Sequence, residues 1–278
     1  MNGPAIKAAV IGWPVAHSQS PRLHSYWLSQ HNIAGSYEAL PVPPEKLALT
    51  LKNLHQSGFI GANLTIPHKE AALALVDHAD PMARRIGAVN TVIAHKDGTL
   101  AGFNTDAYGF THNILSVGFH PRARPVVVLG AGGAARAAIV ALQDMDVSDI
   151  RLVNRTQARA ESLAREFGAP VRAVAWNDAA SALEGAALLI NTTSLGMEGQ
   201  PPLELSLTYL PREALVSDLV YAPLKTDLLK RAEARGNRIL DGLGMLLHQA
   251  RPAFAAFFGR EPQVTEELRR HVLEGQKA

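Results

Sequence analysis

Cysteine is absent from the chain, and its absence excludes disulfide bonds, thiolate catalysis and cysteine-based zinc sites. No apolar run reaches the roughly 18 residues that a membrane-spanning helix needs. The beginning of the sequence, MNGPAIKAAVIGWP, also lacks the long apolar segment of a secretory signal peptide. These absences are typical of a protein that works in a reducing cytosol, so we expect a cytoplasmic location.

A strong excess of one charge is missing too. The chain has 27 Lys and Arg against 25 Asp and Glu, which gives a formal net charge of +2. This balance argues against nucleic acid or a membrane surface as the main partner. The 278 residues are 47% hydrophobic and 19% charged, a composition typical of globular enzymes with room for two domains. We expect a small-molecule substrate and no metal; a monomer and a homodimer both fit the sequence.

Strand-like and helix-like segments alternate in the first part of the chain. Strands are expected at 5–12, 36–42 and 60–67, and helices at 20–33, 43–58 and 68–77. We expect Ser20 to cap the first helix, with Pro21 at its first position. Two further strands within 88–106 are joined by a hairpin turn at Asp97 and Gly98. The alternation predicts an α/β domain with a largely parallel sheet.

The second part of the chain carries stronger α/β signals. Strands are expected within 125–130, 149–156, 186–197 and 214–223, and two helices without an intervening strand within 241–259 and 263–275. We therefore predict a two-lobed α/β fold. A substrate-binding catalytic domain spans 1–103, a doubly wound Rossmann domain spans 104–239, and C-terminal helices at 240–278 return to the first lobe. A cleft between the lobes would suit a ligand.

A glycine turn follows the first strand of the second part. The stretch GAGGAA, residues 130–135, matches G-x-G-x-x-A between a predicted strand and a predicted helix. Gly130 permits a tight turn, Gly132 lets a pyrophosphate approach the backbone, and Ala135 allows close packing of helix on sheet. The free N–H groups of the helix would face the phosphates. The alternative is a glycine-rich turn without a ligand.

The end of the next strand bears on the choice of cofactor. An NAD site usually has Asp or Glu there to hold the ribose 2′-hydroxyl. The stretch NRTQAR supplies Asn154, Arg155, Thr156 and Arg159 instead, with no carboxylate. Arginine attracts a 2′-phosphate, so this pattern favours NADP. The alternative is that the arginines are solvated charges, although a cation near a helix N-terminus is unfavourable.

Polar side chains gather at the predicted strand ends of the first part. They are Ser18, Ser20, Asn63, Thr65, Lys69, Asn90, the NTD stretch at 104–106, and Gln249 near the C-terminus. A small polyhydroxylated acid needs such a set, because each buried hydroxyl must find a partner. Each residue has an alternative role in turns or caps, above all Ser20 and Asp106.

Lys69 raises a question of its own. The strand in GANLTIPHKEA should end at Pro67, because proline cannot donate to a sheet ladder. Lys69 then falls in the first turn of a helix, where a cation is disfavoured. Strand ends in α/β proteins are where chemistry tends to lie, so Lys69 is a candidate for a chemical role. The alternative is a solvated lysine at a helix start.

The motifs SPRLH, NLTIPHK, AVNT, GFNTD, GAGGAAR, NRT, TSLGM and DGLGML occur in this order along nearly the whole chain. In this order the sequence resembles the shikimate dehydrogenase family. The resemblance implies reversible, NADP-dependent reduction of 3-dehydroshikimate to shikimate by hydride transfer, in aromatic amino-acid (chorismate) biosynthesis. No motif position departs from the family pattern.

The resemblance also implies residue roles. It makes Lys69 and Asp106 the catalytic pair, both in contact with the substrate, and assigns them the proton of the reaction. A lysine can donate a proton to the ketone oxygen during reduction, and a carboxylate beside it holds it in place. The other substrate-binding residues that it implies are Ser18, Ser20, Asn63, Thr65, Asn90, Tyr221 and Gln249. The cofactor-binding residues that it implies are Gly130, Ala131, Gly132, Gly133, Ala134, Asn154, Arg155, Thr156, Arg159, Thr193, Ser194, Leu195, Gly196, Met197, Leu219, Gly242 and Met245.

Two other functions stay open at this point. One is a quinate/shikimate dehydrogenase or a related enzyme that acts on another cyclohexane acid, with NAD as a possible cofactor; Arg155 weighs against NAD, and both serines of HSQSP favour shikimate. The other is a sensor that binds NADP without catalysis. The presence of both Lys69 and Asp106 argues against a sensor, since a non-catalytic relative could lose either residue.

Overall fold

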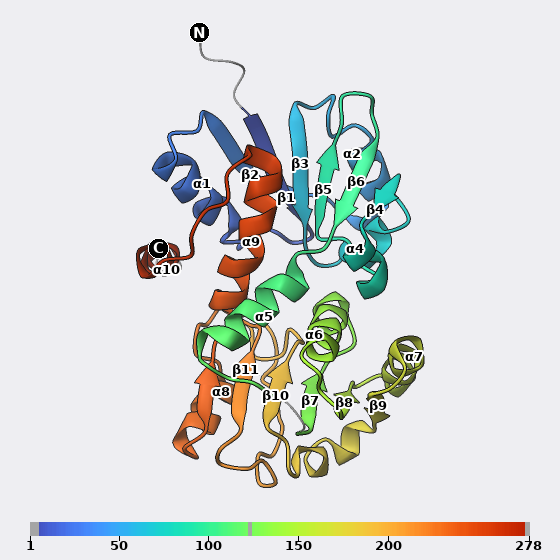
Figure 1. Ribbon diagram of the computed structural model, residues 1–278, viewed down its shortest axis with the longest axis vertical. Coiled ribbons are helices and arrows are strands. Elements are labelled where there is room, and N and C mark those ends of the chain that lie inside the picture. Colours follow the sequence, from blue (N-terminus) through green and yellow to red (C-terminus); the bar gives the residue numbers. More distant parts are fainter. Residues whose placement is uncertain (1–5, 122–123, 276–278) are drawn as a thin grey trace. The chain divides into compact units, whose positions relative to one another are not determined.

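A computed structural model describes residues 6–121 and 124–275 of the chain (Figure 1). The chain forms two compact units, Met1–Gly109 with Leu246–Ala278 and Phe110–Met245. Within the described residues, each unit is built on one six-stranded sheet. The predicted α/β fold with a Rossmann-like second sheet is confirmed.

The sheet of the first unit is mixed. Its strands are β1 (Ile6–Gly12), β2 (Gly35–Pro41), β3 (Phe59–Leu64), β4 (His78–Ala79), β5 (Thr91–Ala94) and β6 (Leu100–Phe103), in the order β2-β1-β3-β5-β6-β4. The pairs of β1 with β2 and β3 are parallel, as expected. However, β5 runs antiparallel to both β3 and β6. The predicted hairpin at Gly98, which has a φ of 88°, reverses the chain between β5 and β6, whereas β4 pairs parallel with β6.

The helices between these strands are α1 (Ser20–Gln30), α2 (Leu47–Lys52), α3 (Lys69–Ala72) and α4 (Pro81–Ile86), with a 3₁₀ turn at Pro44–Lys46. The helices expected at 43–58 and 68–77 are therefore shorter than predicted. After α3 the chain is held by the sheet instead. The Asp77 N–H donates to the Leu100 carbonyl, and the Leu100 N–H donates to the Asp77 carboxylate at 2.8 Å. These contacts end the helical path before β4.

Ser20 does not cap α1, which corrects the sequence-based expectation. The N-cap residue is Gln19, and its side chain makes no capping bond. Ser20 is the first helical residue, so Pro21 is the second. The hydroxyl of Ser18 accepts the Ser20 N–H at 3.3 Å. Ser18 therefore performs the local role that the sequence assigned to Ser20.

The sheet of the second unit is parallel throughout. Its strands are β7 (Val126–Leu129), β8 (Ile150–Val153), β9 (Val171–Val174), β10 (Leu188–Asn191), β11 (Leu215–Asp218) and β12 (Arg238–Leu240), in the order β12-β11-β10-β7-β8-β9. The order reverses between β7 and β10, the doubly wound pattern of dinucleotide-binding folds. The two edge strands, β9 and β12, were not predicted from the sequence.

Helices α6 (Gly133–Asp144), α7 (Gln157–Phe167) and α8 (Asp227–Ala234) connect these parallel strands, with short 3₁₀ turns at Trp176–Asp178 and Ser181–Leu183. The core cluster of this unit includes Val127, Leu189 and Val216, one from each of three neighbouring strands. Because both faces of the sheet are covered, β7 reads VVVL and is buried throughout.

The C-terminal helices are α9 (Leu243–Phe258) and α10 (Glu266–Glu274), and α5 (Asp106–Ser116) follows the first sheet. Phe254 of α9 packs edge-on against Trp27 of α1, with ring centroids 5.4 Å apart. The indole N–H of Trp27 donates to the Gln263 carbonyl at 3.2 Å. These contacts confirm that the C-terminal helices return to the first unit.

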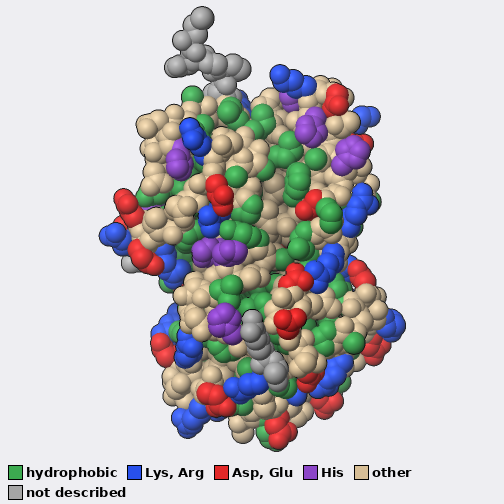
Figure 2. Space-filling model, in the orientation of Figure 1, with side chains coloured by type: hydrophobic (Ala, Val, Ile, Leu, Met, Phe, Trp, Pro, Cys, Tyr) green, Lys and Arg blue, Asp and Glu red, His purple; other side chains and the backbone are tan. Residues whose placement is uncertain are grey.

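Lys, Arg, Asp and Glu side chains are interspersed over the face shown in Figure 2.

Among the described helices, none combines the length and the apolar character needed to cross a membrane. Within residues 6–121 and 124–275, no group of three or more His, Asp or Glu side chains is arranged to hold a metal ion.

Candidate active site

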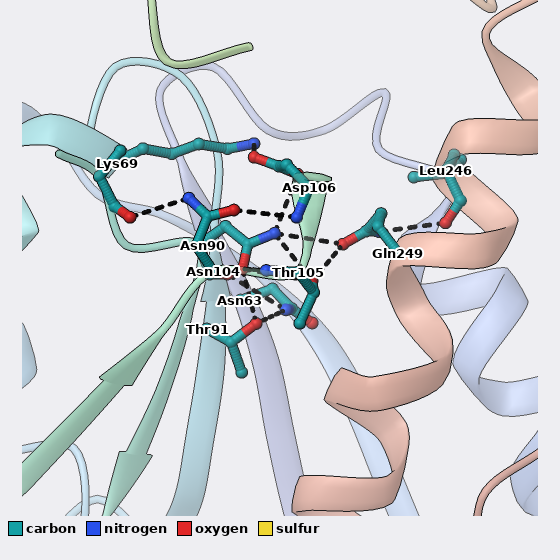
Figure 3. Close-up of polar contacts among 10 residues, drawn as sticks. Asn63, Lys69, Asn90, Thr91, Asn104, Thr105, Asp106, Leu246 and Gln249 are labelled. Carbon is teal, nitrogen blue, oxygen red and sulfur yellow. Dashed lines mark hydrogen bonds and ion pairs between the residues drawn. The ribbon is translucent and has the colours of Figure 1, made fainter. Parts of the chain in front are cut away.

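Lys69 and Asp106 form an ion pair in the first unit. Lys69 opens α3 after the end of β3, and Asp106 opens α5 after the end of β6. The Lys69 Nζ lies 2.5 Å from Asp106 Oδ2, and their side chains are 19% and 4% exposed (Figure 3). The fold therefore brings together two residues that lie 37 positions apart in the sequence. A partly accessible ammonium held by a buried carboxylate is an arrangement suited to proton transfer.

Asn90 connects this pair to the sheet. Its Nδ2 donates to Asp106 Oδ1 and to Thr105 Oγ1, each at 2.9 Å. Its Oδ1 accepts the Thr105 N–H at 2.9 Å. The Lys69 carbonyl also accepts the N–H of Val89, the residue before Asn90. Asn90 thus holds the carboxylate oxygen that does not face Lys69.

Asn63, at the end of β3, lies behind Asn90 in the same network. Its Nδ2 donates to the Asn90 carbonyl at 3.2 Å and to Thr91 Oγ1 at 2.9 Å. Its Oδ1 accepts from the Tyr37 hydroxyl at 2.6 Å. Both amide hydrogens are therefore used within the protein.

Tyr37 and Thr91 were missed by the sequence analysis. Thr91 is the last residue of the AVNT motif, directly after Asn90, and that position was the available signal. Tyr37 lies within a predicted strand where alternation points it inward, but an inward tyrosine in a strand usually means core packing. The contact with Asn63 crosses 26 residues of sequence, so no local pattern could show it.

Gln249 reaches the network from α9, as Figure 3 shows. Its Oε1 lies 3.3 Å from Thr105 Oγ1 and 3.5 Å from Asn90 Nδ2. The helix α9 thus places a C-terminal side chain beside Asn90, just before β5, and Thr105, just before α5. Asn104 serves the turn, because its Oδ1 accepts the Asp106 N–H and its Nδ2 donates to the Ala88 carbonyl.

The other predicted substrate-binding residues lie in other segments of the chain. Ser18 and Ser20 lie before and at the start of α1, Thr65 follows β3, and Tyr221 follows β11 in the second unit. Thr65 donates its N–H to the Ile11 carbonyl, which holds its segment against β1. Their predicted contacts with a substrate stay predictions.

The glycine turn between β7 and α6 has the geometry expected for a phosphate site. Gly130 has a φ of 109°, and an added Cβ would lie 2.5 Å from Thr192 Oγ1. Gly132 differs, because an added Cβ would meet no described atom within 4 Å. This open space lies at the N-terminus of α6, a helix of 12 residues with free N–H groups. Gly130 is required by the turn, whereas Gly132 leaves room for an approaching group.

The end of β8 carries no carboxylate. Asn154 and Arg155 follow Val153 directly, and the side chain of Asn154 donates to the Thr156 carbonyl at 2.9 Å. Thr156 is the N-cap residue of α7 but makes no side-chain capping bond. Arg155 and Arg159 are exposed. A guanidinium in this position fits a cofactor that carries a 2′-phosphate.

The loop 193–197, which contains the TSLGM motif, is built on buried polar groups below it. Asn191 Oδ1 accepts both the N–H and the hydroxyl of Thr193, and its Nδ2 donates to the Leu195 carbonyl and to Asp218 Oδ1. Burial raises the pKa of Asp218 to about 6, although Thr226, Val220 and Asn191 donate hydrogen bonds to it. Thr193 therefore shapes the loop, while Ser194 and Met197 lie on its exposed side.

Gly242 is fixed by packing. An added Cβ there would lie 2.2 Å from the Leu219 carbonyl oxygen, so the two backbones touch. Met245 is buried in α9 at 8% exposure. The predicted cofactor roles of Leu219, Gly242 and Met245 stay predictions beside this structural role.

Comparisons with known families agree with both halves of the chain. Residues 10–92 match the family model described as shikimate dehydrogenase substrate binding domain. Residues 116–197 match the model described as shikimate / quinate 5-dehydrogenase. The first match contains Lys69 and Asn90, and the second contains the glycine turn.

Relatives cover almost the whole chain. Shikimate dehydrogenase (NADP(+)) of Paramagnetospirillum magneticum is 56% identical over 275 residues, which cover 98% of this chain and 100% of the relative. The crystal structure of shikimate 5-dehydrogenase from Thermus thermophilus in complex with NADP(H) and shikimate is 42% identical, with a TM-score of 0.87 over 97% of this chain and 99% of that one. Quinate dehydrogenase from Corynebacterium glutamicum in complex with NAD is 31% identical, with a TM-score of 0.89 over 97% and 99%.

Proposed function

The chain belongs to the NADP-dependent shikimate dehydrogenase family, and we propose that Lys69 and Asp106 are its proton-transfer site. Membership makes the protein an oxidoreductase of aromatic amino-acid biosynthesis that uses NADP(H). The observation that carries the residue-level proposal is the Lys69–Asp106 pair inside a buried polar network. Shikimate and 3-dehydroshikimate are the substrates of the two directions.

The chemistry assigns a clear task to Lys69. A bound nicotinamide cofactor would supply the hydride for the reduction of 3-dehydroshikimate, and the carbonyl oxygen then needs a proton. The Lys69 ammonium donates that proton, which leaves a neutral amine and the new hydroxyl of shikimate. In the opposite direction the amine accepts the hydroxyl proton. Asp106 holds the Nζ in place through the ion pair.

The remaining polar residues would bind the substrate. Gln249 and Asn90 lie next to the ion pair, and we propose that they pair with substrate hydroxyls. Ser18 and Ser20 would donate hydroxyl hydrogens to the substrate carboxylate. Thr65 and Tyr221 complete the set that the family resemblance implies. A site built to pair each hydroxyl rejects analogues that lack one.

The second unit has features that fit NADP. The open space at Gly132, at the start of α6, accommodates a pyrophosphate near free N–H groups. Arg155 would hold the 2′-phosphate after β8, where NAD sites carry a carboxylate. The loop 193–197, with Leu219, Gly242 and Met245, would complete the cofactor site.

Replacement of the lysine tests this proposal. Lys69→Ala should lower kcat by roughly 10²–10⁴, the usual contribution of a general acid, with a much smaller change in KM. Asp106→Asn should also lower kcat. The double variant should lose less than the product of the two single losses, because the residues act as a unit. Steady-state kinetics with shikimate and NADP⁺ measure all three.

Lys96→Ala is a matched control, since Lys96 is an exposed lysine in the β5–β6 turn of the same unit. It should retain wild-type kcat. If Lys69→Ala keeps kcat within about threefold of wild type, Lys69 is not the general acid, because a general acid contributes far more than that. Assays of shikimate and quinate with NADP⁺ and NAD⁺ separate this enzyme from a quinate dehydrogenase. NADP binding without any turnover would indicate a sensor.

A further inference from the structure

Tyr37 is buried far along the network from Lys69, and the proposed reaction gives it no role. Its side chain is 5% exposed, and its hydroxyl donates to Asn63 Oδ1 at 2.6 Å. The ring stacks on His24, with centroids 3.9 Å apart and an interplanar angle of 6°. A buried tyrosine hydroxyl needs a hydrogen-bond partner, and here that partner belongs to the network that reaches Asp106.

Each amide in the network has one possible orientation. The backbone carbonyl oxygen of Asn90 can only accept a hydrogen bond, so the side-chain nitrogen of Asn63 must face it. The Thr105 N–H can only donate, so the oxygen of Asn90 must face it. Two backbone groups therefore fix which end of each side chain donates.

With these orientations the hydrogen bonds run in one direction. Tyr37 donates to Asn63, Asn63 Nδ2 donates to Thr91 Oγ1, and Thr91 donates to Asn90 Oδ1 at 2.9 Å. Asn90 Nδ2 then donates to Asp106 Oδ1. Successive hydrogen bonds that point the same way strengthen one another. The Asp106 carboxylate lies at the accepting end, opposite Lys69.

We propose that Tyr37 and Thr91 are positioning residues, which act through Asn63 and Asn90 to hold the Asp106 carboxylate in line with Lys69. This inference rests on the proposed roles of Lys69 and Asp106. Neither Tyr37 nor Thr91 needs to touch the substrate. Four of the five side chains in the relay are at most 5% exposed, and Asn63 is 7% exposed, so bulk water cannot easily replace a missing donor.

The stacked His24 supports this arrangement without competing in it. It is fully buried, and neither ring nitrogen has a hydrogen-bond partner among the described residues. Burial raises the pKa of Tyr37 well above its usual value. The phenol therefore keeps its proton, and its only acceptor in the relay is Asn63.

Two volume-conserving variants test the inference. Tyr37→Phe keeps the ring on His24, and Thr91→Val keeps the size of the side chain. Each should lower kcat for shikimate oxidation by about tenfold, the change in rate that one hydrogen bond corresponds to. KM for NADP⁺ should stay within about twofold, because the lost bond acts on the reacting pair rather than on cofactor binding. Melting temperatures and the active fraction are measured alongside.

A double-variant cycle separates positioning from simple loss of structure. In an Asn90→Ala background the relay is already broken, so Tyr37→Phe should cause no further fall in kcat. Tyr26→Phe is the matched control. It removes a hydroxyl that contacts Glu267 and Thr265, outside the relay, and should leave kcat unchanged.

Several results would overturn the inference. One is wild-type kcat in both Tyr37→Phe and Thr91→Val. Another is a Tyr37→Phe loss that persists in full in the Asn90→Ala background, because a structural defect would add. If Tyr37→Phe does not fold, Thr91→Val decides alone. Lys69→Ala is assayed in parallel: normal turnover there would refute the proposed reaction, whereas a normal Tyr37→Phe beside an impaired Lys69→Ala would refute only the relay.

Discussion

Arg155 is the residue on which the choice between NADP and NAD depends. It is exposed after β8 and would meet the 2′-phosphate as a charge-assisted contact, worth about 1.5–3 kcal/mol. Arg155→Ala should therefore raise KM for NADP⁺ by roughly 10-fold to 150-fold. KM for NAD⁺, which lacks the phosphate, should change little.

Steady-state kinetics with both cofactors check this prediction. Arg165→Ala is a suitable control, because Arg165 is exposed at the far end of the same helix, α7. It should leave both constants unchanged. Equal losses of affinity for NADP⁺ and NAD⁺ in Arg155→Ala would mean that Arg155 stabilises the loop instead.

His24 makes the stability of the first unit depend on pH. Burial lowers its pKa from 6.5 to about 3. The unfolded chain therefore binds a proton near pH 6.5 that the folded chain does not. Above pH 6.5 His24 is neutral in both states and the free energy of unfolding does not depend on it. As the pH falls from 6.5 toward 3, the free energy of unfolding decreases by about 1.4 kcal/mol per pH unit.

His24→Phe removes this titration and keeps an aromatic ring beside Tyr37. The free energy of unfolding should then fall less between pH 7.5 and pH 5 than in the wild type, by about 2 kcal/mol. Urea unfolding at both pH values measures the difference. A constant offset from altered packing cancels in this comparison. The same pH dependence in both proteins would contradict the prediction.

At the scale of elements, the turn between β7 and α6 contains two glycines with different roles: Gly130 is needed for the fold, and Gly132 leaves room for a ligand. Gly130→Ala forces a side chain into a left-handed conformation and against Thr192, which should destabilise the protein by about 1–3 kcal/mol. Gly132→Ala adds a methyl group in open space, so the melting temperature should stay near that of the wild type. The methyl group should nevertheless hinder the pyrophosphate and weaken NADP binding. A Gly132→Ala variant with wild-type affinity in a fluorescence titration with NADPH would refute this reading of the turn.

The elements also show what the sequence could and could not predict. Periodicity identified the strands that carry the site. Pro67 placed the end of β3 three residues too late, because the strand ends at Leu64. The length of α3 was overestimated, since contacts with the sheet, such as Asp77 with Leu100, end a helix that its own residues would continue. The helix α2 is also shorter than predicted, since it ends at Lys52 with Asn53 as its C-cap residue. The strands β9 and β12 were missed because they are partly exposed edge strands, VRAV and RIL, without the continuous apolar run of the buried strands.

The sequence predicted those site residues that lie in short polar stretches at strand ends. Lys69, Asn90 and Asp106 stand at strand ends in polar stretches, and the structure brings these three together. Tyr37 and Thr91 joined the site only when the sheet aligned β2, β3 and β5. Ser20 had an N-cap residue type, but Gln19 occupies that position with no side-chain bond, so residue preference alone was misleading.

At the scale of the whole molecule, the first unit is made from both ends of the chain. Its core requires α9, since Phe254 is fully buried against rings from α1. Gln249, from the same helix, reaches the Asn90 network. The order of elements therefore inserts the parallel sheet of the second unit between two segments that fold together.

This organisation predicts which parts of the chain each ligand protects from hydrogen exchange. NADP⁺ alone should slow amide exchange mainly within Phe110–Met245, above all around 130–136 and 154–159. Shikimate alone should slow exchange mainly within Met1–Gly109 and Leu246–Ala278, around 63–69, 90 and 104–106. A ligand at 100 times its Kd stabilises the folded state by about 2.7 kcal/mol, so slowing of up to roughly 100-fold is expected where exchange requires loss of the site. In Gly132→Ala the NADP⁺ effect should disappear and the shikimate effect should remain, because the two sites belong to different units. Protection by NADP⁺ concentrated in the first unit instead would contradict the assignment of the cofactor to the parallel sheet.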